Sequence, residues 1–331
     1  MIGIFRQKNP ANTLILFFYA LALKFSSLLY PLPPLRQAED SYLYNLLLDF
    51  LRPLNIPDLI YSVLAFFLLL IQASLFNRII NTQRMFARPN FLPAMSYILL
   101  SSLFAEWNQF SAPLLINTLL IWIFYRITNL YNSSSPNVGV FNIGLMLGIT
   151  MLFFKPAAIF ILLIPFALFI MRPFRVREWL IGFLGVTTPF YFLAVILFLS
   201  DDFLWSRVLP DINFDMPPIP NSLFITASIA LLVIPFIMGG YYVQDNLNKM
   251  LIQIRKSWSI LLNFLILCVL LILVSGGDKY VNWICCLVPL SAFHAAAYYY
   301  AEKSRFAVIL HWIIFAYAIF LNYFPQIGTL Q

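Results

Sequence analysis

Long apolar stretches alternate with short polar linkers along the whole chain. Each apolar stretch has about 15–22 residues, and a helix of that length spans roughly 22–33 Å, close to the thickness of a bilayer core. We therefore predict an all-α, polytopic membrane helical bundle with about eleven transmembrane helices. The predicted segments are residues 13–30, 58–77, 91–105, 112–128, 138–154, 157–171, 179–199, 222–243, 258–274, 281–300 and 306–324.

The composition excludes a soluble domain. Of the 331 residues, 62% are hydrophobic and only 10% are charged, whereas soluble domains carry about 25% charged residues. No stretch is long and polar enough to form a second domain, so residues 1–331 are predicted to form a single integral membrane domain. The three cysteines, Cys268, Cys285 and Cys286, lie inside apolar segments, which favours a packing role over disulfides or a metal site.

The basic residues predict which end of the bundle faces the cytoplasm. A basic elbow at residues 172–177 contains Arg172, Arg175 and Arg177, and most of the other Lys and Arg residues lie in linkers on the same side. Lys and Arg in short loops are retained in the cytoplasm, so we expect a cytoplasmic N-terminus and an external C-terminus, in a bacterial inner membrane. This distribution accounts for the net charge of +7 without a nucleic-acid partner.

The opposite, outer side carries most of the acidic residues. Acidic residues contribute little to membrane orientation, so their position suggests that polar chemistry or recognition takes place there. One outer turn is predicted at Lys155-Pro156, because proline cannot continue a helix without losing a hydrogen bond.

The first outer loop contains a predicted amphipathic helix. Its polar residues are Ser41, Asn45, Asp49 and Arg52, a spacing that places them on one helical face, and Pro53 ends the pattern. We expect this helix to lie parallel to the membrane in the outer interface. Asp40 directly precedes it, where a carboxylate can cap a helix N-terminus. The alternative is that Glu39 or Asp40 acts as a general base at the lipid–water boundary.

This layout resembles the GT-C glycosyltransferases, polytopic enzymes that transfer a sugar from a polyprenyl-phosphate carrier at the outer face. The resemblance covers the first seven predicted helices: acidic residues in the first outer loop, a membrane-parallel helix after them, and the segment 155–199 with its basic elbow and Pro189. It implies that Glu39 or Asp40 is the catalytic carboxylate. The layout is also similar to uncharacterised multi-spanning bacterial membrane families, and that similarity implies no activity.

Cations on the outer side are candidates for binding a lipid-linked phosphate, which needs one or two such groups. They are Lys155, Arg36, Arg52, Arg207 and Lys279, and the alternative role for each is an anchor in the membrane interface. We expect no cofactor and no metal. Asp201-Asp202 is the one acidic pair suited to a divalent ion, and a solvated pair at a helix end is the preferred interpretation.

Few ionisable residues lie inside the predicted membrane segments. Lys24 is near enough to the outer end of its segment for its amine to reach the interface. His294 and His311 have no carboxylate nearby in their segments, so we expect neutral, packed rings that hydrogen-bond to Tyr or backbone groups. Such a sparse set makes an ion-coupled transporter the weakest functional hypothesis.

Two functional hypotheses therefore remain ahead of the transporter. The first is a GT-C-like protein that handles polyprenyl-phosphate-linked sugars, either as a glycosyltransferase acting at the outer face or as a non-catalytic relative. The second is a non-catalytic structural or assembly subunit of a cell-envelope complex. The expected partners are membrane lipids, a polyprenyl-linked sugar donor and envelope-complex subunits.

Overall fold

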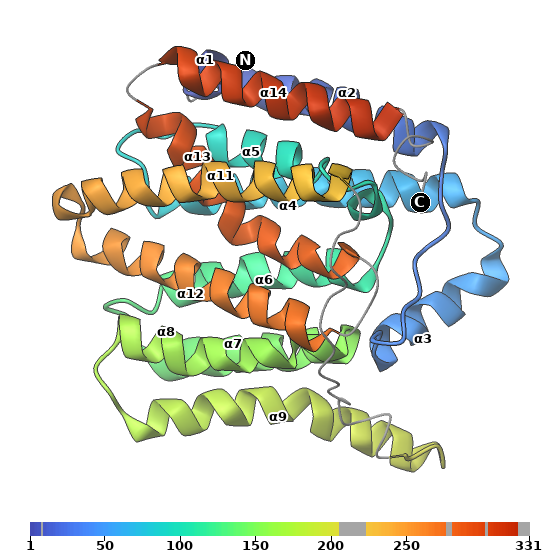
Figure 1. The fold of residues 1–331 in the computed structure, drawn as a ribbon. Coiled ribbons are helices and arrows are strands. Elements are labelled where there is room, and N and C mark those ends of the chain that lie inside the picture. The colour runs from blue at the N-terminus through green and yellow to red at the C-terminus, as the bar shows by residue number, and fades with distance from the viewer. Residues whose placement is uncertain (8, 205–222, 276–279, 302–303, 324–331) are drawn as a thin grey trace.

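The computed structural model describes residues 1–7, 9–204, 223–275, 280–301 and 304–323. This described part of the chain is helical, with one isolated β-bridge and no strand (Figure 1). Its elements are α1 (Ile2–Phe5), α2 (Ala11–Leu29), α3 (Tyr42–Leu51), η1 (Arg52–Leu54), α4 (Asp58–Thr82), α5 (Leu92–Leu100), η2 (Ala105–Asn108), α6 (Ala112–Thr128), α7 (Pro136–Phe153), η3 (Lys155–Leu162), α8 (Leu163–Met171), α9 (Val176–Leu199), α11 (Leu223–Asn246), η4 (Leu247–Lys249), α12 (Ile252–Val274), η5 (Tyr280–Cys286), α13 (Leu287–Tyr300) and α14 (Ser304–Tyr323).

Eight helical segments in the described chain are long and apolar enough to cross a membrane. They are Ala11–Leu29, Asp58–Thr82, Pro136–Phe153, Val176–Leu199, Leu223–Lys249, Ile252–Leu273, Tyr280–Tyr300 and Arg305–Tyr323. The length and apolar composition of these helices are those expected of a polytopic membrane protein. The other three predicted segments correspond to the shorter helix α6, to η3 with α8, and to α5, so the count of eleven transmembrane helices stays a prediction.

α5 is shorter than the predicted segment 91–105, and its end has a structural cause. After Leu100 the chain leaves the helix, and the hydroxyls of Ser101 and Ser102 both donate to the Ile98 carbonyl at 2.9 Å. The carbonyls of the two serines instead accept bonds from side chains of α2 and α14. Irregular backbone is tolerated at membrane depth where neighbouring protein groups satisfy it.

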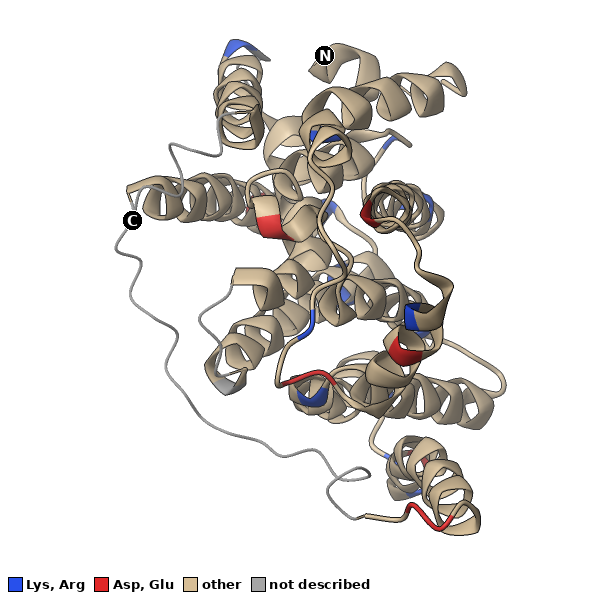
Figure 2. Ribbon diagram, turned by 90° about the vertical axis from the view of Figure 1, so that its right-hand side faces the viewer, with Lys and Arg blue, Asp and Glu red and all other residues tan. Residues whose placement is uncertain are grey.

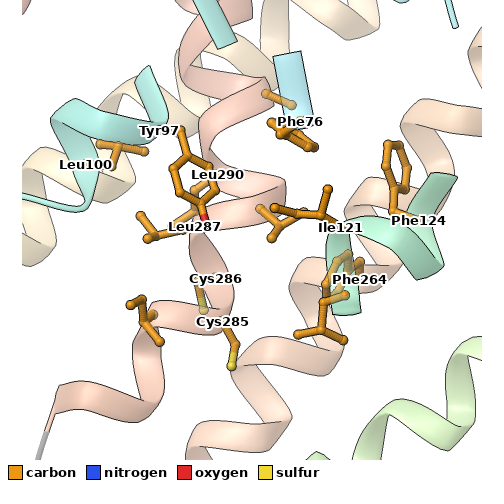
Figure 3. Packing of buried hydrophobic residues seen from close by; sticks show 14 of the residues in the cluster. Phe76, Tyr97, Leu100, Ile121, Phe124, Phe264, Cys285, Cys286, Leu287 and Leu290 are labelled. Atoms are coloured by element: carbon orange, nitrogen blue, oxygen red, sulfur yellow. The ribbon is translucent and has the colours of Figure 1, made fainter. Parts of the chain in front are cut away.

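The core of the bundle surrounds η5 and α13. In an 18-residue apolar stretch of Tyr280–Tyr300, 89% of the residues are buried, against 22% in the corresponding stretch of Leu223–Lys249. Figure 3 shows Tyr97 and Leu100 from α5 packed near Leu287 and Leu290, with side chains of α4, α6 and α12 around them. The cysteines are free and buried, and the Cys268 thiol donates to the Cys285 carbonyl at 3.4 Å. The prediction that they pack in the interior is therefore confirmed.

Glycines let two helix pairs approach closely. A Cβ atom added at Gly144 of α7 would lie 2.1 Å from the Gly182 carbonyl oxygen of α9, and one at Gly239 of α11 would lie 1.9 Å from the Phe293 carbonyl oxygen of α13. Both distances are far below van der Waals contact. Small residues commonly allow such close packing between helices in membranes.

The basic elbow and α3 lie at opposite ends of the bundle (Figure 1). Following the predicted orientation, we call the end with the elbow the inner end and the end with α3 the outer end. At the inner end, Arg172 and Glu178 form a buried ion pair of 2.9 Å, and Arg172 also donates to the Leu130 carbonyl at 3.2 Å. The elbow is thus attached to the connection that follows α6.

Candidate functional site

The predicted site lies at the outer end, in the connection between α2 and α3. This connection contains Pro31, Pro33 and Pro34, which disfavour helix, and it runs without regular structure. It is tied to the connection before α6, because the Leu35 amide donates to the Phe110 carbonyl at 2.8 Å. Figure 2 looks onto this end, where acidic and basic segments lie close together in the loops.

A short antiparallel bridge joins Asp40 to Phe154, at the turn between α7 and η3. The Ser41 amide donates to the Phe153 carbonyl at 3.1 Å, and the Lys155 amide donates to the Glu39 carbonyl at 3.0 Å. The predicted turn at Lys155-Pro156 is confirmed, since α7 ends at Phe153. The bridge brings the two candidate catalytic acids beside Lys155, one of the candidate phosphate ligands.

The Asp40 carboxyl is turned into the protein. Asp40 is 3% exposed, and its Oδ2 accepts a bond from the Gln37 amide at 2.7 Å. Its Oδ1 is buried and has no hydrogen-bond partner among the described residues. A buried oxygen without a partner is costly to ionise, so this atom is the most unusual polar feature of the site.

The prediction that Asp40 caps the following helix is wrong. The N-cap residue of α3 is Ser41, and no side chain makes a capping bond there. The Asp40 carboxyl instead accepts from the Gln37 amide three residues upstream, in a turn in which the Asp40 amide donates to the Gln37 carbonyl at 3.2 Å. The carboxyl therefore closes that turn and leaves the helix uncapped.

Burial raises the pKa of Asp40 from 3.8 to about 7. The Gln37 hydrogen bond opposes this rise, the Glu39 charge adds to it, and the charges of Arg36 and Lys155 lower the pKa slightly. Loss of hydration is therefore the dominant effect. A carboxyl with a pKa near 7 is well suited to proton transfer at neutral pH.

A separate groove at the outer end holds two of the other predicted cations. Its volume is about 470 Å³. It is lined by Pro33, Pro34, Arg36, Leu48, Leu51, Arg52, Asn55, Ile56 and Tyr61. Arg36 forms an exposed ion pair with Asp49 of α3, whereas Arg52 makes no ion pair with another described residue. Charged groups and apolar walls are thus combined in a single groove.

The predicted site residues fall into two groups. Glu39, Asp40 and Lys155 meet at the bridge, while Arg36 and Arg52 line the groove. Arg36 links the two groups, since its charge acts on the pKa of Asp40. Two other predicted cations, Arg207 and Lys279, lie outside the described residues.

The acidic pair Asp201-Asp202 follows α9 and is exposed. In the part of the chain that the structure describes, no group of three or more His, Cys, Asp or Glu side chains could hold a metal ion. The expectation of a solvated pair without a metal stays a prediction.

Lys24 does not reach the interface as expected. Its side chain is 1% exposed, and its Nζ donates to the Ser101 carbonyl at 3.2 Å and to Oδ1 of Asn108. Asn108 in turn donates to Oδ1 of Asn322 at 3.2 Å, and Asn322 donates to the Ser102 carbonyl at 2.7 Å. The Ser101 carbonyl, released by the end of α5, and the Asn108 side chain compensate the buried amine, which removes the need for it to reach water.

Sequence reasoning missed the asparagines of this polar cluster. A cavity of about 270 Å³ lies against them. Its lining residues are Ser26, Ser27, Tyr30, Leu32, Ser62, Ala105, Asn108, Gln109, Leu321 and Asn322. The sequence signal for this cluster is Lys24 itself, because a cation inside a membrane segment requires polar partners on neighbouring helices.

The two histidines are packed in the interior. Nε2 of His294 lies 2.8 Å from the Leu232 carbonyl, which confirms the expected backbone partner. His311 stacks on Tyr19 with ring centroids 5.9 Å apart, and its ring nitrogens have no hydrogen-bond partner among the described residues. The expected bond is therefore absent for His311, and aromatic packing replaces it.

Comparison of the chain with known protein families, with curated proteins and with solved structures finds no match. The fold and the outer-end geometry are therefore the grounds on which a function can be argued.

Proposed function

We propose that this protein is a GT-C-like integral membrane protein of a bacterial inner membrane that handles polyprenyl-phosphate-linked sugars and transfers the sugar at its outer face. The observation that carries the proposal is the bridge between Asp40 and Phe154, which sets a carboxyl with a pKa of about 7 beside Lys155. A carboxyl that titrates near neutral pH and a neighbouring cation are the two groups that such a transfer requires.

Each group has a defined part in the proposed reaction. Asp40 accepts the proton of the acceptor hydroxyl while the hydroxyl oxygen bonds to C1 of the sugar. The bond between C1 and the phosphate oxygen breaks, and the polyprenyl phosphate leaves with its electron pair. Lys155 and Arg36 stabilise the negative charge of the leaving phosphate, and no further co-reactant is needed.

The groove beside α3 suits the lipid part of the donor. Leu48, Leu51 and Ile56 supply apolar walls, and Arg36 and Arg52 supply positive charge near them. An isoprenoid phosphate has the complementary combination of an apolar chain and an anionic head.

The exposed surface of α3 supports a position in the outer membrane interface. Leu46 and Phe50 are 50% and 72% exposed, next to the exposed Asp49. A helix that exposes both kinds of residue fits a position parallel to the membrane, with the apolar side chains in lipid and the polar ones in water.

A non-catalytic assembly subunit is the second candidate, and one observation favours it. Asp40 is 3% exposed, with its carboxyl bonded to the Gln37 amide. A residue in that position can act purely as a structural link between the first outer loop and the α7–η3 turn.

Amide variants distinguish the two candidates. Asp40→Asn retains the size of the side chain and an oxygen for the Gln37 amide, but it cannot accept a proton. If Asp40 is the base, this variant should fold normally and lose activity by a factor of about 10² to 10⁴. The measurement is the amount of sugar-modified product in the envelope of cells that carry each variant at matched protein levels.

The matched control is Asp58→Asn, which removes an exposed acid from the start of α4 at the same end of the bundle. It should leave the product unchanged. Glu39→Gln tests the alternative base in the same assay. Normal product from Asp40→Asn, from Glu39→Gln and from the double variant would reject the enzymatic proposal and favour the assembly subunit.

A further inference from the structure

A second polar feature lies at the inner end of α4, far from the proposed reaction. Ser74, Asn77, Arg78, Asn81 and Thr82 follow the spacing i, i+3, i+4, i+7 and i+8, which places them on one face of the helix. They form one wall of a groove of about 470 Å³. Thr13 of α2, with Pro89 and Phe91 of the connection to α5, completes this polar groove.

The polar groove contains two groups that lack partners. Arg78 is exposed, and its guanidinium makes no hydrogen bond or ion pair with the described residues. Asn77 is 5% exposed, and its Oδ1 is buried without a partner in the described structure. The polar groove is thus lined by both an unpaired cation and an asparagine whose amide oxygen lacks a hydrogen-bond donor among the described residues.

An apolar groove of about 320 Å³ adjoins the polar groove on the other side of Arg78. It is lined by Leu75, Arg78, Ile79, Thr82, Thr118, Ile121, Trp122 and Tyr125. The grooves share Arg78 and Thr82. The Arg126 guanidinium lies over the Trp122 ring, 4.4 Å from its centroid. Because Trp122 lines the apolar groove, Arg126 is a second cation beside that groove.

The face of α4 that leads to these grooves is exposed and apolar. Leu64, Phe67, Ile71 and Leu75 are 46%, 46%, 50% and 39% exposed, and they continue the helical row that ends at Arg78. From Leu64 to Arg78 the helix rises about 21 Å at 1.5 Å per residue, enough to cover one leaflet of a bilayer core. An acyl chain can therefore lie along this row with its head group at Arg78.

We infer that the paired grooves at the inner end of α4 bind an anionic phospholipid with a hydroxyl-bearing head group, of the phosphatidylglycerol class. Arg78 binds the phosphate, and Asn77 accepts a hydrogen bond from a head-group hydroxyl. The apolar groove and the exposed row on α4 hold an acyl chain.

The surrounding charges select the head group. The segments around the grooves, residues 1–13, 75–90 and 118–137, contain Arg and Lys but no Asp or Glu. No carboxylate in these segments can therefore bind the ammonium group of phosphatidylethanolamine, and the arginines repel it. Basic pockets between helices on the cytoplasmic side are typical binding sites for anionic lipids.

The test uses the full-length protein in nanodiscs with equal amounts of phosphatidylglycerol and phosphatidylethanolamine of matched acyl chains. Native mass spectrometry counts the lipids that remain bound after transfer into detergent. The wild type should retain phosphatidylglycerol in preference to phosphatidylethanolamine. Arg78→Gln should lower that preference by about tenfold, which corresponds to about 1.4 kcal/mol.

Two further variants separate the site from general surface charge. Arg84→Gln removes the same charge from the connection that follows α4, at a residue that lines neither groove, and should retain the preference. Ser74→Trp keeps Arg78 but fills the polar groove from an exposed position, and should lose the bound lipid. If Arg78→Gln fails to fold, Ser74→Trp still tests whether the lipid is bound in the polar groove.

Three results would overturn the inference: equal retention of the two lipids by the wild type, an effect of Arg84→Gln as large as that of Arg78→Gln, or a bound lipid that survives in Ser74→Trp. Excess inorganic phosphate distinguishes a lipid site from a phosphate site. Inorganic phosphate should not displace the lipid. Full displacement would mean that the acyl chain contributes nothing to binding and would contradict a lipid site.

Discussion

At the residue scale, Asp40 is the group whose environment matters most. It is buried, one of its oxygens lacks a partner among the described residues, and the raised pKa follows from the loss of hydration. The same burial serves either role: a base that is poised near neutral pH, or a neutral link in a tightly packed turn. The pH dependence of stability measures this environment directly.

We expect the stability of the fold to decrease as the pH rises from about 4 to about 7. In that range the unfolded Asp40 ionises at its ordinary pKa of 3.8, while the folded carboxyl retains its proton until about pH 7. Protons bound preferentially by the folded state stabilise it at low pH, and this contribution, at most about 4 kcal/mol, is lost above pH 7.

Asp40→Asn removes the titrating group and provides the comparison. Melting temperatures in detergent, measured between pH 4 and pH 8, should be similar for the two proteins at pH 4. The variant should become increasingly more stable than the wild type toward pH 8. Parallel curves would contradict a buried, high-pKa carboxyl at this position.

At the element scale, the packing of α11 against α13 depends on one of two adjacent glycines. A Cβ at Gly239 would lie 1.9 Å from the Phe293 carbonyl oxygen, whereas a Cβ at Gly240 would have no atom within 4 Å. Alanine at Gly239 therefore tests the close packing of the two helices. Alanine at Gly240 is the control, because it changes the same helix without entering the contact.

Gly239→Ala should lower the stability by about 1–3 kcal/mol, since α11 and α13 must separate to make room. Gly240→Ala should be neutral or stabilising by up to about 1 kcal/mol, because alanine favours helix. Thermal unfolding of both variants in detergent provides the measurement. Equal effects at the two positions would show that α11 does not approach α13 as closely as described.

The helices themselves were largely predictable from the apolar pattern. The helix predicted after Asp40 is present as α3, and the turn at Lys155 is where proline chemistry places it. The contacts between distant segments were not predictable. Hydropathy does not indicate that Asp40 pairs with Phe154 or that the end of α5 binds Lys24, because such pairings depend on how whole helices pack. The capping role expected for Asp40 failed for a local reason, because the Gln37 amide in the preceding turn binds the carboxyl instead.

At the scale of the whole molecule, the orientation in the membrane remains the main prediction. Opposite ends of the bundle carry the basic elbow and α3, so one labelling experiment can assign both ends. The native cysteines Cys268, Cys285 and Cys286 are buried and should give little background.

Single cysteines at exposed positions should report the orientation. Ala38→Cys, in the first outer loop, should react in intact cells with a thiol reagent that cannot cross the membrane. Ser134→Cys and Asn248→Cys, both exposed at the inner end, should react only after the membrane is permeabilised. Reaction of Ser134→Cys in intact cells would reverse the orientation and place the proposed site in the cytoplasm.

The bridge between Asp40 and Phe154 also determines when the outer site can form during biosynthesis. Asp40 leaves the ribosome early, but Phe154 follows only after α4, α5, α6 and α7 have been made. Until α7 is inserted, the Ser41 amide and the Glu39 carbonyl lack these partners, so we expect the Asp40 carboxyl to retain more of its hydration and an acidity closer to the ordinary one. A nascent chain therefore acquires its poised carboxyl late, once the seventh α-helix is in place, and incomplete chains cannot carry out the proposed chemistry.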